Sequence, residues 1–226
     1  MNRLTRRGIF FDLDGTLADS KTALRQVFRD FAASCGRETT DADYDALQGP
    51  PVPIIIAKLK RDWALPQKSA DLLQRYNQLI DAAFIQIPPM PGAAATLEAA
   101  CAHGWKVGVV TSNNAARSRA WLARRGLASF VEIVVGGDEV CLGKPQPEPY
   151  RVALARSGCA RELSVAIEDT LAGARSALAA GLRTFGYAPP GRETIEWPES
   201  VRLINAFDEL LPELTRPRTR RMAGMR

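Results

Sequence analysis

The stretch FFDLDGTLADS, residues 10–20, places three acids within eight positions directly after an apolar run. The apolar residues of GIFFDL predict a buried β-strand that ends at these acids. Two carboxylates as close as those of Asp12 and Asp14 repel each other, and burial makes their repulsion more costly. A fold tolerates such a pair when a positive charge, most simply a metal ion, lies between them. The stretch therefore predicts a cation site at the end of the first strand.

Short apolar runs of the same kind recur along the chain, and helical patterns separate them. The runs are WKVGVVT (105–111), FVEIVV (130–135), LSVAIED (163–169) and LRTFGYA (182–188). They are almost continuously apolar, as expected of strands buried on both faces of a parallel sheet. Gly126, Gly158 and Gly181 stand where the intervening helices should end. This alternation predicts an α/β fold with a doubly wound parallel sheet.

Residues 20–88 interrupt the alternation, because they contain several helical patterns and no convincing strand. The patterns are KTALRQVFRDFAASCG, ADYDALQ, PIIIAKLKRDW and SADLLQRYNQLIDAAF. The Pro- and Gly-rich IPPMPG (87–92) then closes the segment. We therefore predict a catalytic core formed by residues 1–19 and 89–215, a helical cap over 20–88, and a basic, disordered tail over 216–226.

The composition is typical of a globular protein, with 46% hydrophobic residues and a net charge of +5. No apolar run approaches the roughly 20 residues that span a bilayer. The basic start MNRLTRRGIFF has too short an apolar stretch for a secretory signal, so we expect a cytoplasmic protein without a membrane partner. RPRTRRMAGMR (216–226) holds five arginines, but aromatic residues do not interleave with them. We interpret it as a solvated end and do not expect nucleic acid as a partner.

The cysteines and the histidine argue against several kinds of site. Cys35, Cys101, Cys141 and Cys159 are scattered and show no C-x-x-C spacing, which predicts reduced, mostly buried thiols rather than a disulfide framework or a structural zinc site. His103 is the only histidine, and it stands where a helix should end at Gly104. A helix-terminal role is the simpler interpretation of this residue.

Polar residues follow the predicted strands at the points where the strands end. In an open α/β sheet, ligands bind outside the carboxyl ends of the strands, so these residues should converge. They are Asp12 and Asp14 after the first strand, Thr111, Ser112 and Asn113 after the second, Lys144 beyond the third, and Glu168 and Asp169 at the fourth. Acids suit a hard cation, while hydroxyls and a lysine suit an anion. The set predicts a site for phosphate and Mg²⁺.

The same segments carry a resemblance to a known family. Four stretches resemble, in order and spacing, the four motifs of the haloacid dehalogenase-like superfamily. They are DLDGT, VVTSN, GKPQPEPY and IEDTLAGARSALAAGL. The resemblance extends through about residue 188 and includes that family's helical cap. It implies a Rossmann-like core with an inserted helical cap. It also implies a Mg²⁺-dependent phosphomonoesterase, similar to phosphoglycolate phosphatases, that acts on a small phosphorylated metabolite as a monomer or a homodimer.

The resemblance also implies a role for each catalytic residue. Asp12 would attack phosphorus and become an aspartyl-phosphate, which splits one difficult displacement into two easier ones. Asp14 would protonate the leaving oxygen and then activate the hydrolytic water. Thr111 would donate a hydrogen bond to a phosphoryl oxygen, and Lys144 would neutralise charge on Asp12 and on the phosphate.

The metal ligands and the substrate contacts follow in the same way. Asp12, the backbone carbonyl of Asp14 and Asp169 would hold Mg²⁺, with Glu168 in direct contact with the metal or just behind the ligands. For substrate contacts, the candidates are Ser112 and Asn113 at the strand end and Gln48 and Gly49, with Pro50 and Pro51, in the predicted cap loop.

Several functions remain open at this point. The acid at position 14 is typical of phosphatases and phosphomutases, and dehalogenases lack it. The hexose phosphomutases of the family have a histidine where this chain has Leu24 and an arginine near Val52, which favours a phosphatase. QGPP resembles the phosphoglycolate phosphatase-like branch, whereas IEDT resembles the sugar-phosphate branch. A non-catalytic phosphate-binding regulatory module, which should carry a damaged site, is the rival from another class.

Overall fold

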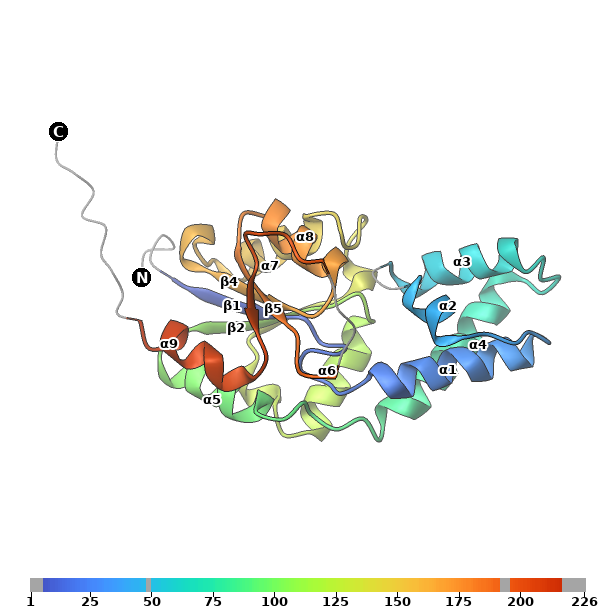
Figure 1. Ribbon diagram of the computed structural model, residues 1–226, viewed down its shortest axis with the longest axis horizontal. Helices are drawn as coiled ribbons and strands as arrows, with labels where there is room; N and C mark the ends of the chain where they lie inside the picture. The colour runs from blue at the N-terminus through green and yellow to red at the C-terminus, as the bar shows by residue number, and fades with distance from the viewer. Residues whose placement is uncertain (1–5, 48–49, 192–195, 217–226) are drawn as a thin grey trace.

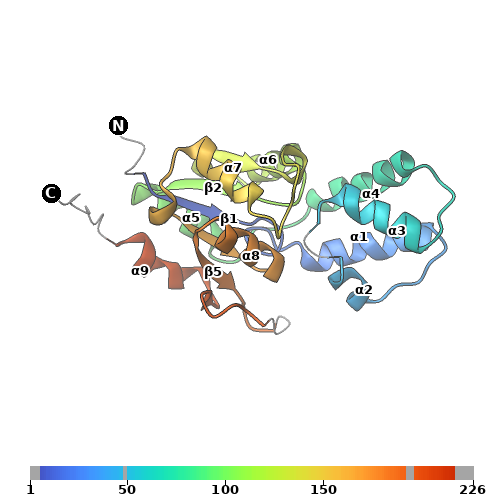
Figure 2. The ribbon, with the colours of Figure 1, turned by 90° about the horizontal axis from the view of Figure 1, so that it is seen from above.

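The computed structural model describes residues 6–47, 50–191 and 196–216. Figures 1 and 2 show a core of sheet and helices, from which a second group of helices projects beyond the ends of the strands. In the described part of the chain, no helix combines the length and the hydropathy needed to cross a membrane. Gln48, Gly49 and residues 217–226, which include nearly all of the predicted tail, lie outside the described residues.

The described residues form one six-stranded sheet in which all neighbouring strands are parallel. The strands are β1 (Gly8–Phe11), β2 (Lys106–Val110), β3 (Ile133–Val135), β4 (Val165–Glu168), β5 (Arg183–Tyr187) and β6 (Arg202–Ile204), in the order β3-β2-β1-β4-β5-β6. From β1 the chain builds outward first on one side and then on the other. The predicted doubly wound parallel sheet is confirmed.

Helices cover both faces of the sheet (Figure 1). They are α5 (Ala93–Ala102), α6 (Ala115–Arg124), α7 (Glu148–Ser157), α8 (Leu171–Ala179) and α9 (Leu211–Leu214). Short 3₁₀ turns complete the core: η2 (Ala128–Phe130), η3 (Gly137–Glu139), η4 (Arg161–Leu163) and η5 (Phe207–Leu210). Helices α7 and α8 lie on one face, and α5, α6 and α9 lie on the other. The predicted helix ends at Gly126, Gly158 and Gly181 are confirmed, since all three adopt positive φ there.

Successive residues of β1 point into two different hydrophobic clusters, because side chains alternate across a strand. Phe10 packs in the cluster that contains Val110 and Tyr150, whereas Ile9 and Phe11 belong to the larger cluster on the other face. All of these side chains are buried. Burial on both faces explains why the strand reads as a continuous apolar run, and it holds Asp12 rigidly at the end of β1.

The projecting segment consists of helices, with no strand among its described residues. It contains α1 (Lys21–Ser34), α2 (Asp41–Asp45), α3 (Val52–Asp62) and α4 (Ser69–Phe84). Its own apolar interior joins α1 to α4, where the rings of Phe31 and Tyr76 meet edge to face at 4.9 Å. Where the segment leaves the core, Asp19 N donates to Pro88 O and Met90 N donates to Leu17 O, so the two connections run side by side.

The structure differs from the sequence predictions at three places. No element was predicted between residues 189 and 215, where β6, η5 and α9 lie. FVEIVV was predicted as strand from residue 130, but residues 128–130 form η2 and the strand begins at Ile133. All four cysteines are free, as predicted, yet the expectation that most are buried is wrong. Cys101 and Cys141 are exposed, because one faces outward from α5 and the other lies in a surface loop.

Candidate active site

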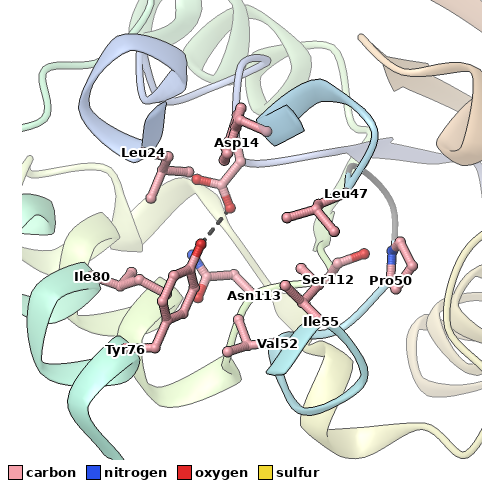
Figure 3. Close-up of a pocket in the computed structure, with 11 residues that line it drawn as sticks. Asp14, Leu24, Leu47, Pro50, Val52, Ile55, Tyr76, Ile80, Ser112 and Asn113 are labelled. Atoms are coloured by element: carbon pink, nitrogen blue, oxygen red, sulfur yellow. Dashed lines mark hydrogen bonds between the residues drawn. The ribbon is translucent and has the colours of Figure 1, made fainter. Parts of the chain in front are cut away.

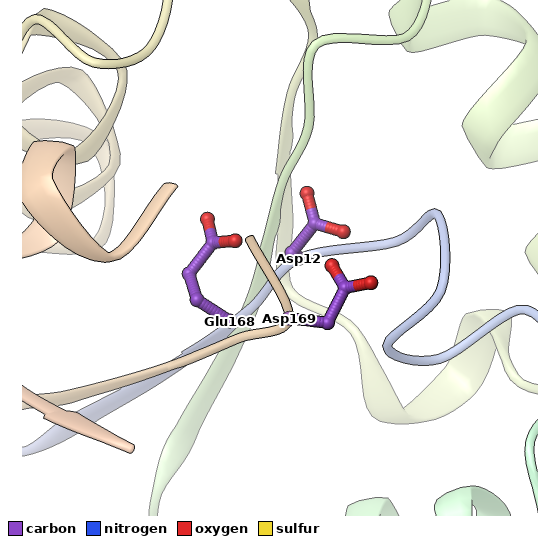
Figure 4. Close-up of side chains that lie close together, drawn as sticks. All are labelled: Asp12, Glu168 and Asp169. Carbon is purple, nitrogen blue, oxygen red and sulfur yellow. The ribbon is translucent and has the colours of Figure 1, made fainter. Parts of the chain in front are cut away.

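An acidic cluster lies at the point where the strand order reverses. Asp12 directly follows β1, Glu168 ends β4, and Asp169 comes next. One carboxylate oxygen from each of these residues lies within 4.8 Å of the others (Figure 4). Strands β1 and β4 are neighbours from opposite halves of the chain, and their carboxyl ends form the crevice where doubly wound sheets bind ligands. The topology of the fold therefore creates this cluster.

Lys144 brings a positive charge into the cluster. Its Nζ lies 2.6 Å from Asp12 Oδ1 and 2.5 Å from Glu168 Oε1, and it also donates to Val110 O at 2.9 Å. All three charged side chains are buried. Burial alone would lower the pKa of the Lys144 ammonium, but the two carboxylates raise it above its usual value. Lys144 therefore stays protonated beside Asp12.

Glu168 is surrounded by partners of its own. Its Oε1 accepts from Tyr150 Oη at 2.5 Å as well as from Lys144, and its Oε2 accepts from Thr170 Oγ1 at 3.5 Å. A Cβ at Gly173 would collide with the Glu168 carboxylate. Only glycine, which has no Cβ, lets helix α8 lie this close to Glu168. Tyr150 was not singled out from the sequence, since an aromatic residue in an apolar helix is typical of a core position.

Asp169 contacts the loop that follows β1 and the start of α1. Its Oδ2 lies 2.9 Å from Lys21 Nζ, and its Oδ1 accepts from Thr16 Oγ1 at 3.4 Å. Gly15 adopts a φ of 88°, and a Cβ there would collide with the Asp169 carboxylate. The sequence pattern did not point to Lys21, the first residue of a predicted surface helix. Through Lys21 the helical segment contacts the acidic cluster.

Asp14 points toward the helical segment rather than into the cluster. Its Oδ2 accepts from Asn113 Nδ2 at 3.0 Å, while its buried Oδ1 has no hydrogen-bond partner within the described residues. Burial raises the pKa of Asp14, although the side chains of Ser20 and Asn113 oppose the shift. Asn113 Oδ1 in turn accepts from Arg117, whose guanidinium also contacts Asp81 on α4. Arg117 was not predicted, because it belongs to a helix face and not to a strand end.

Thr111, Ser112 and Asn113 form the turn after β2. Thr111 Oγ1 accepts from the backbone N–H of Asn113 at 3.0 Å, which holds the turn closed. The following loop packs tightly on this turn, since a Cβ at Gly137 would collide with the Ser112 carbonyl. Strand β2 pairs with β1, so the turn emerges beside Asp12 and Asp14.

A cavity of about 110 Å³ separates the core from the helical segment (Figure 3). Asp14, Ser112 and Asn113 line its core side. Residues of the helical segment complete the lining: Leu24, Tyr44, Leu47, Pro50, Val52, Ile55, Tyr76 and Ile80. The predicted substrate contacts Gln48 and Gly49 lie outside the described residues, but the adjacent Pro50 lines the cavity.

The donor set of the cluster fits a hard divalent cation. Asp12, Glu168 and Asp169 offer buried carboxylate oxygens close enough to one another to share one ion, and Mg²⁺ prefers oxygen ligands. Lys144 binds Asp12 and Glu168, and Lys21 binds Asp169, so a cation at this site would share the three carboxylates with the two ammonium groups. The site thus places an acidic cluster, a buried ammonium and a carboxyl group of raised pKa around one crevice.

Comparison with known proteins identifies the family. Residues 9–187 match the family model described as haloacid dehalogenase-like hydrolase. The chain belongs to this family. This confirms the resemblance seen in the sequence, and the haloacid dehalogenase-like fold explains why the motif residues meet at the strand ends.

Relatives of this haloacid dehalogenase-like chain include named phosphatases. It is 30% identical over 189 residues to the phosphoglycolate phosphatase of Cereibacter sphaeroides, and the match covers 80% of this chain and 86% of that protein. It is 32% identical over 190 residues to protein CbbY of Rhodobacter capsulatus, covering 78% and 83%. The crystal structure of CbbY from Rhodobacter sphaeroides in complex with phosphate superposes with a TM-score of 0.80 at 28% identity, covering 92% and 96%. These likenesses support the expected phosphomonoesterase.

Proposed function

We propose that this chain is a Mg²⁺-dependent phosphatase that hydrolyses a small phosphorylated metabolite through an aspartyl-phosphate at Asp12. The observation that carries the proposal is the buried contact of 2.6 Å between Lys144 Nζ and Asp12 Oδ1 beside the acidic cluster. A non-catalytic module would not need a nucleophile, a cation and a proton donor in one crevice. The named phosphatases among its relatives point the same way.

In the first half of the proposed reaction, an Asp12 oxygen forms a bond to phosphorus while the bond from phosphorus to the leaving oxygen breaks. Asp14 transfers its proton to that oxygen, because an alkoxide is a poor leaving group. In the second half, a water molecule attacks phosphorus and gives its proton to Asp14. The bond between Asp12 and phosphorus then breaks, which releases inorganic phosphate and restores both carboxyl groups.

The surroundings of Asp12 and Asp14 suit these different roles. Burial and the neighbouring carboxylates raise the pKa of Asp12 well above its usual value, and Lys144 opposes this shift without cancelling it. The positive charge of the proposed Mg²⁺ would oppose it further and favour the carboxylate that must attack. Burial raises the pKa of Asp14 and favours the protonated acid, although the side chains of Ser20 and Asn113 and the charge of Arg117 oppose the shift. With the cation bound, the two carboxyl groups would differ in protonation state, which is a recurrent solution for acid–base chemistry near neutral pH.

We propose that three groups bind Mg²⁺: the carboxylates of Asp12 and Asp169 and the backbone carbonyl of Asp14. The ion would supply positive charge to the transferring phosphoryl group. Lys144 adds a second positive charge, and Glu168, bound to Lys144 and Tyr150, holds that lysine in place. Thr111, at the end of β2, is the proposed hydrogen-bond donor to a phosphoryl oxygen.

The helical segment is the proposed cap. Its side chains face Asp14 across the cavity, so a bound substrate would be shielded from bulk water. The two positions that distinguish the mutase-like pattern, Leu24 and Val52, both line this cavity and both are apolar. Neither can move a proton or bind a phosphate, which favours the phosphatase over the sugar phosphomutase.

Phosphate release from a panel of phosphorylated metabolites tests the proposal. The panel contains phosphoglycolate, short alkyl phosphates, hexose phosphates and nucleotides, each with and without Mg²⁺. We expect Mg²⁺-dependent release of phosphate that needs no added sugar bisphosphate. A strict requirement for a bisphosphate activator would identify a mutase. The absence of release from every ester would contradict the proposed phosphatase.

A further inference from the structure

We infer that the leaving group of the substrate is a short, uncharged and largely apolar alcohol, rather than one that carries a carboxylate or a second phosphate. This inference rests on the proposed phosphatase function and concerns the cavity between the core and the helical segment. It is carried by the side chains that line this cavity.

The cavity is where the leaving group must lie. Asp14 is the proposed proton donor, so the leaving oxygen has to come within hydrogen-bond reach of its carboxyl group. That carboxyl group lies on the wall of the cavity together with Ser112 and Asn113 (Figure 3). Whatever is attached to the leaving oxygen therefore extends into the space between Asp14 and the helical segment.

The wall opposite Asp14 carries no charge among the described residues. Its aliphatic surface comes from five side chains: Leu24, Leu47, Val52, Ile55 and Ile80. The other side-chain polar groups on that wall are the phenol hydroxyls of two tyrosines. Leu47 and Ile80 are buried and the other three aliphatic side chains are half-buried, and such an apolar wall favours apolar groups and penalises a charge that has no partner.

The two phenols belong to Tyr44 and Tyr76. Burial raises the pKa of Tyr76 to about 12, and it raises the pKa of Tyr44 as well. Both phenols are therefore neutral at physiological pH and can exchange hydrogen bonds with a hydroxyl or a carbonyl group of the leaving group. They cannot neutralise an anion.

Three cations near the cavity are bound to acidic or amide groups. Lys21, on the helix that carries Leu24, lies 2.9 Å from Asp169. The Arg117 guanidinium contacts Asp81 at 2.6 Å and Asn113 at 2.6 Å. Arg25, next to Leu24 in the chain, binds both carboxylate oxygens of Asp45. A carboxylate or a phosphate in the cavity would have to displace one of these acids while lying close to Asp14. The arrangement thus selects against anionic leaving groups.

The size of the cavity agrees with a short alcohol. Its volume of about 110 Å³ is small compared with the roughly 300 Å³ and more of pockets that take drug-sized ligands. A nucleoside would not fit unless the helical segment moved away from the core. Leaving groups of a few carbon atoms are therefore the class expected.

A matched pair of substrates tests the inference in the unmodified protein. Phosphoglycolate and 2-hydroxyethyl phosphate differ only in that a carboxylate replaces a hydroxymethyl group. We expect kcat/KM with Mg²⁺ to be higher for 2-hydroxyethyl phosphate by about tenfold or more, since burying a charge without a partner is costly. n-Propyl phosphate, which is fully apolar, should be hydrolysed at least as efficiently as 2-hydroxyethyl phosphate.

A variant that adds a charge to the cavity should reverse the preference. Val52→Arg places a guanidinium on the cavity wall and should raise the ratio of kcat/KM for phosphoglycolate to that for 2-hydroxyethyl phosphate by about tenfold. Ile54→Arg, on the same helix at a side chain that is 55% exposed and outside the cavity lining, is the matched control and should leave the ratio unchanged.

The possible outcomes separate this inference from the proposed function. A higher kcat/KM for phosphoglycolate than for its uncharged partner would overturn the inference and leave the phosphatase intact. If neither these esters nor p-nitrophenyl phosphate released phosphate, both the proposed function and the inference would be overturned. Because the first comparison uses the unmodified chain, it does not depend on whether the Val52 variant folds.

Discussion

Lys144 Nζ lies 2.6 Å from Asp12 Oδ1, and both residues are buried although 132 positions separate them in the chain. A parallel sheet makes this contact possible, because the loops at the carboxyl ends of its strands meet at one edge. Glu168 binds the same ammonium, so one cation links two carboxylates at the centre of the proposed site.

Replacing Lys144 with Met removes this charge while keeping much of the side-chain volume. We expect kcat with Mg²⁺ to fall by about 10²-fold or more, since preorganised charges supply much of the stabilisation of a transferring phosphoryl group. Steady-state phosphate release measures the loss. Lys58→Met is the matched control, because Lys58 pairs with Asp62 on the exposed face of α3. Wild-type kcat in the Lys144 variant would show that this lysine takes no part in the chemistry.

Asp14→Asn should affect substrates according to how easily their leaving group departs. For alkyl phosphates we expect kcat to fall by about 10²- to 10⁴-fold, because the alkoxide loses its proton donor. p-Nitrophenolate leaves without a proton, so the first step should survive with this ester while the second step loses its base. Stopped-flow absorbance should then show a burst of p-nitrophenol that matches the enzyme concentration. An equal loss for both kinds of ester, without a burst, argues against proton donation by Asp14.

Lys21 Nζ lies 2.9 Å from Asp169 Oδ2, so it would compete with the proposed Mg²⁺ for this carboxylate. In Lys21→Met, we expect Mg²⁺ to bind about three- to tenfold more tightly in calorimetric titrations without substrate. Asp169→Ala should weaken binding sharply. Lys106→Met is the control, because Lys106 pairs with Glu132 at the surface and should leave the titration unchanged. Unchanged Mg²⁺ affinity in both the Lys21 and the Asp169 variants would move the metal site elsewhere.

Gly173→Ala tests the close packing of α8 on the Glu168 carboxylate. Helix propensity alone predicts that Ala stabilises the fold by about 1 kcal/mol over Gly. A Cβ at this position would collide with Glu168, so we expect a net loss of roughly 1–3 kcal/mol of unfolding free energy, as for other overpacked sites. Urea unfolding measures the sign directly. Stabilisation would mean that Glu168 can move aside without cost.

The sequence predicted the parts of this site that follow from the sheet. Parallel strands bring their carboxyl ends together whatever the details of packing. The residues concerned come just after strands (Asp12, Asp14, Thr111 and Asp169) or in the loop beyond β3 (Lys144). The order of motifs was enough to identify the family. For the same reason, the parallel sheet and the helical character of residues 20–88 were visible in the pattern of apolar residues.

Contacts between different elements were not predictable in this way. Lys21, Tyr150 and Arg117 act through side chains whose partners depend on how a helix is rotated and how far it lies from the sheet. A pattern of apolar residues shows which face of a helix is buried, but it does not show which residue of the neighbouring element lies opposite that face. β6 was missed because three residues, of which Arg202 and Leu203 are exposed, carry too little periodicity to stand out.

Trapping the covalent intermediate tests the central role of Asp12 most directly. The protein is mixed with Mg²⁺ and substrate, quenched in acid within a turnover and treated with borohydride, which reduces an aspartyl-phosphate to homoserine. Peptide mass spectrometry should then find homoserine at position 12, and no conversion in Asp12→Asn. Phosphate release by the unmodified protein with position 12 unreduced, or with the modification at another residue, would contradict the mechanism.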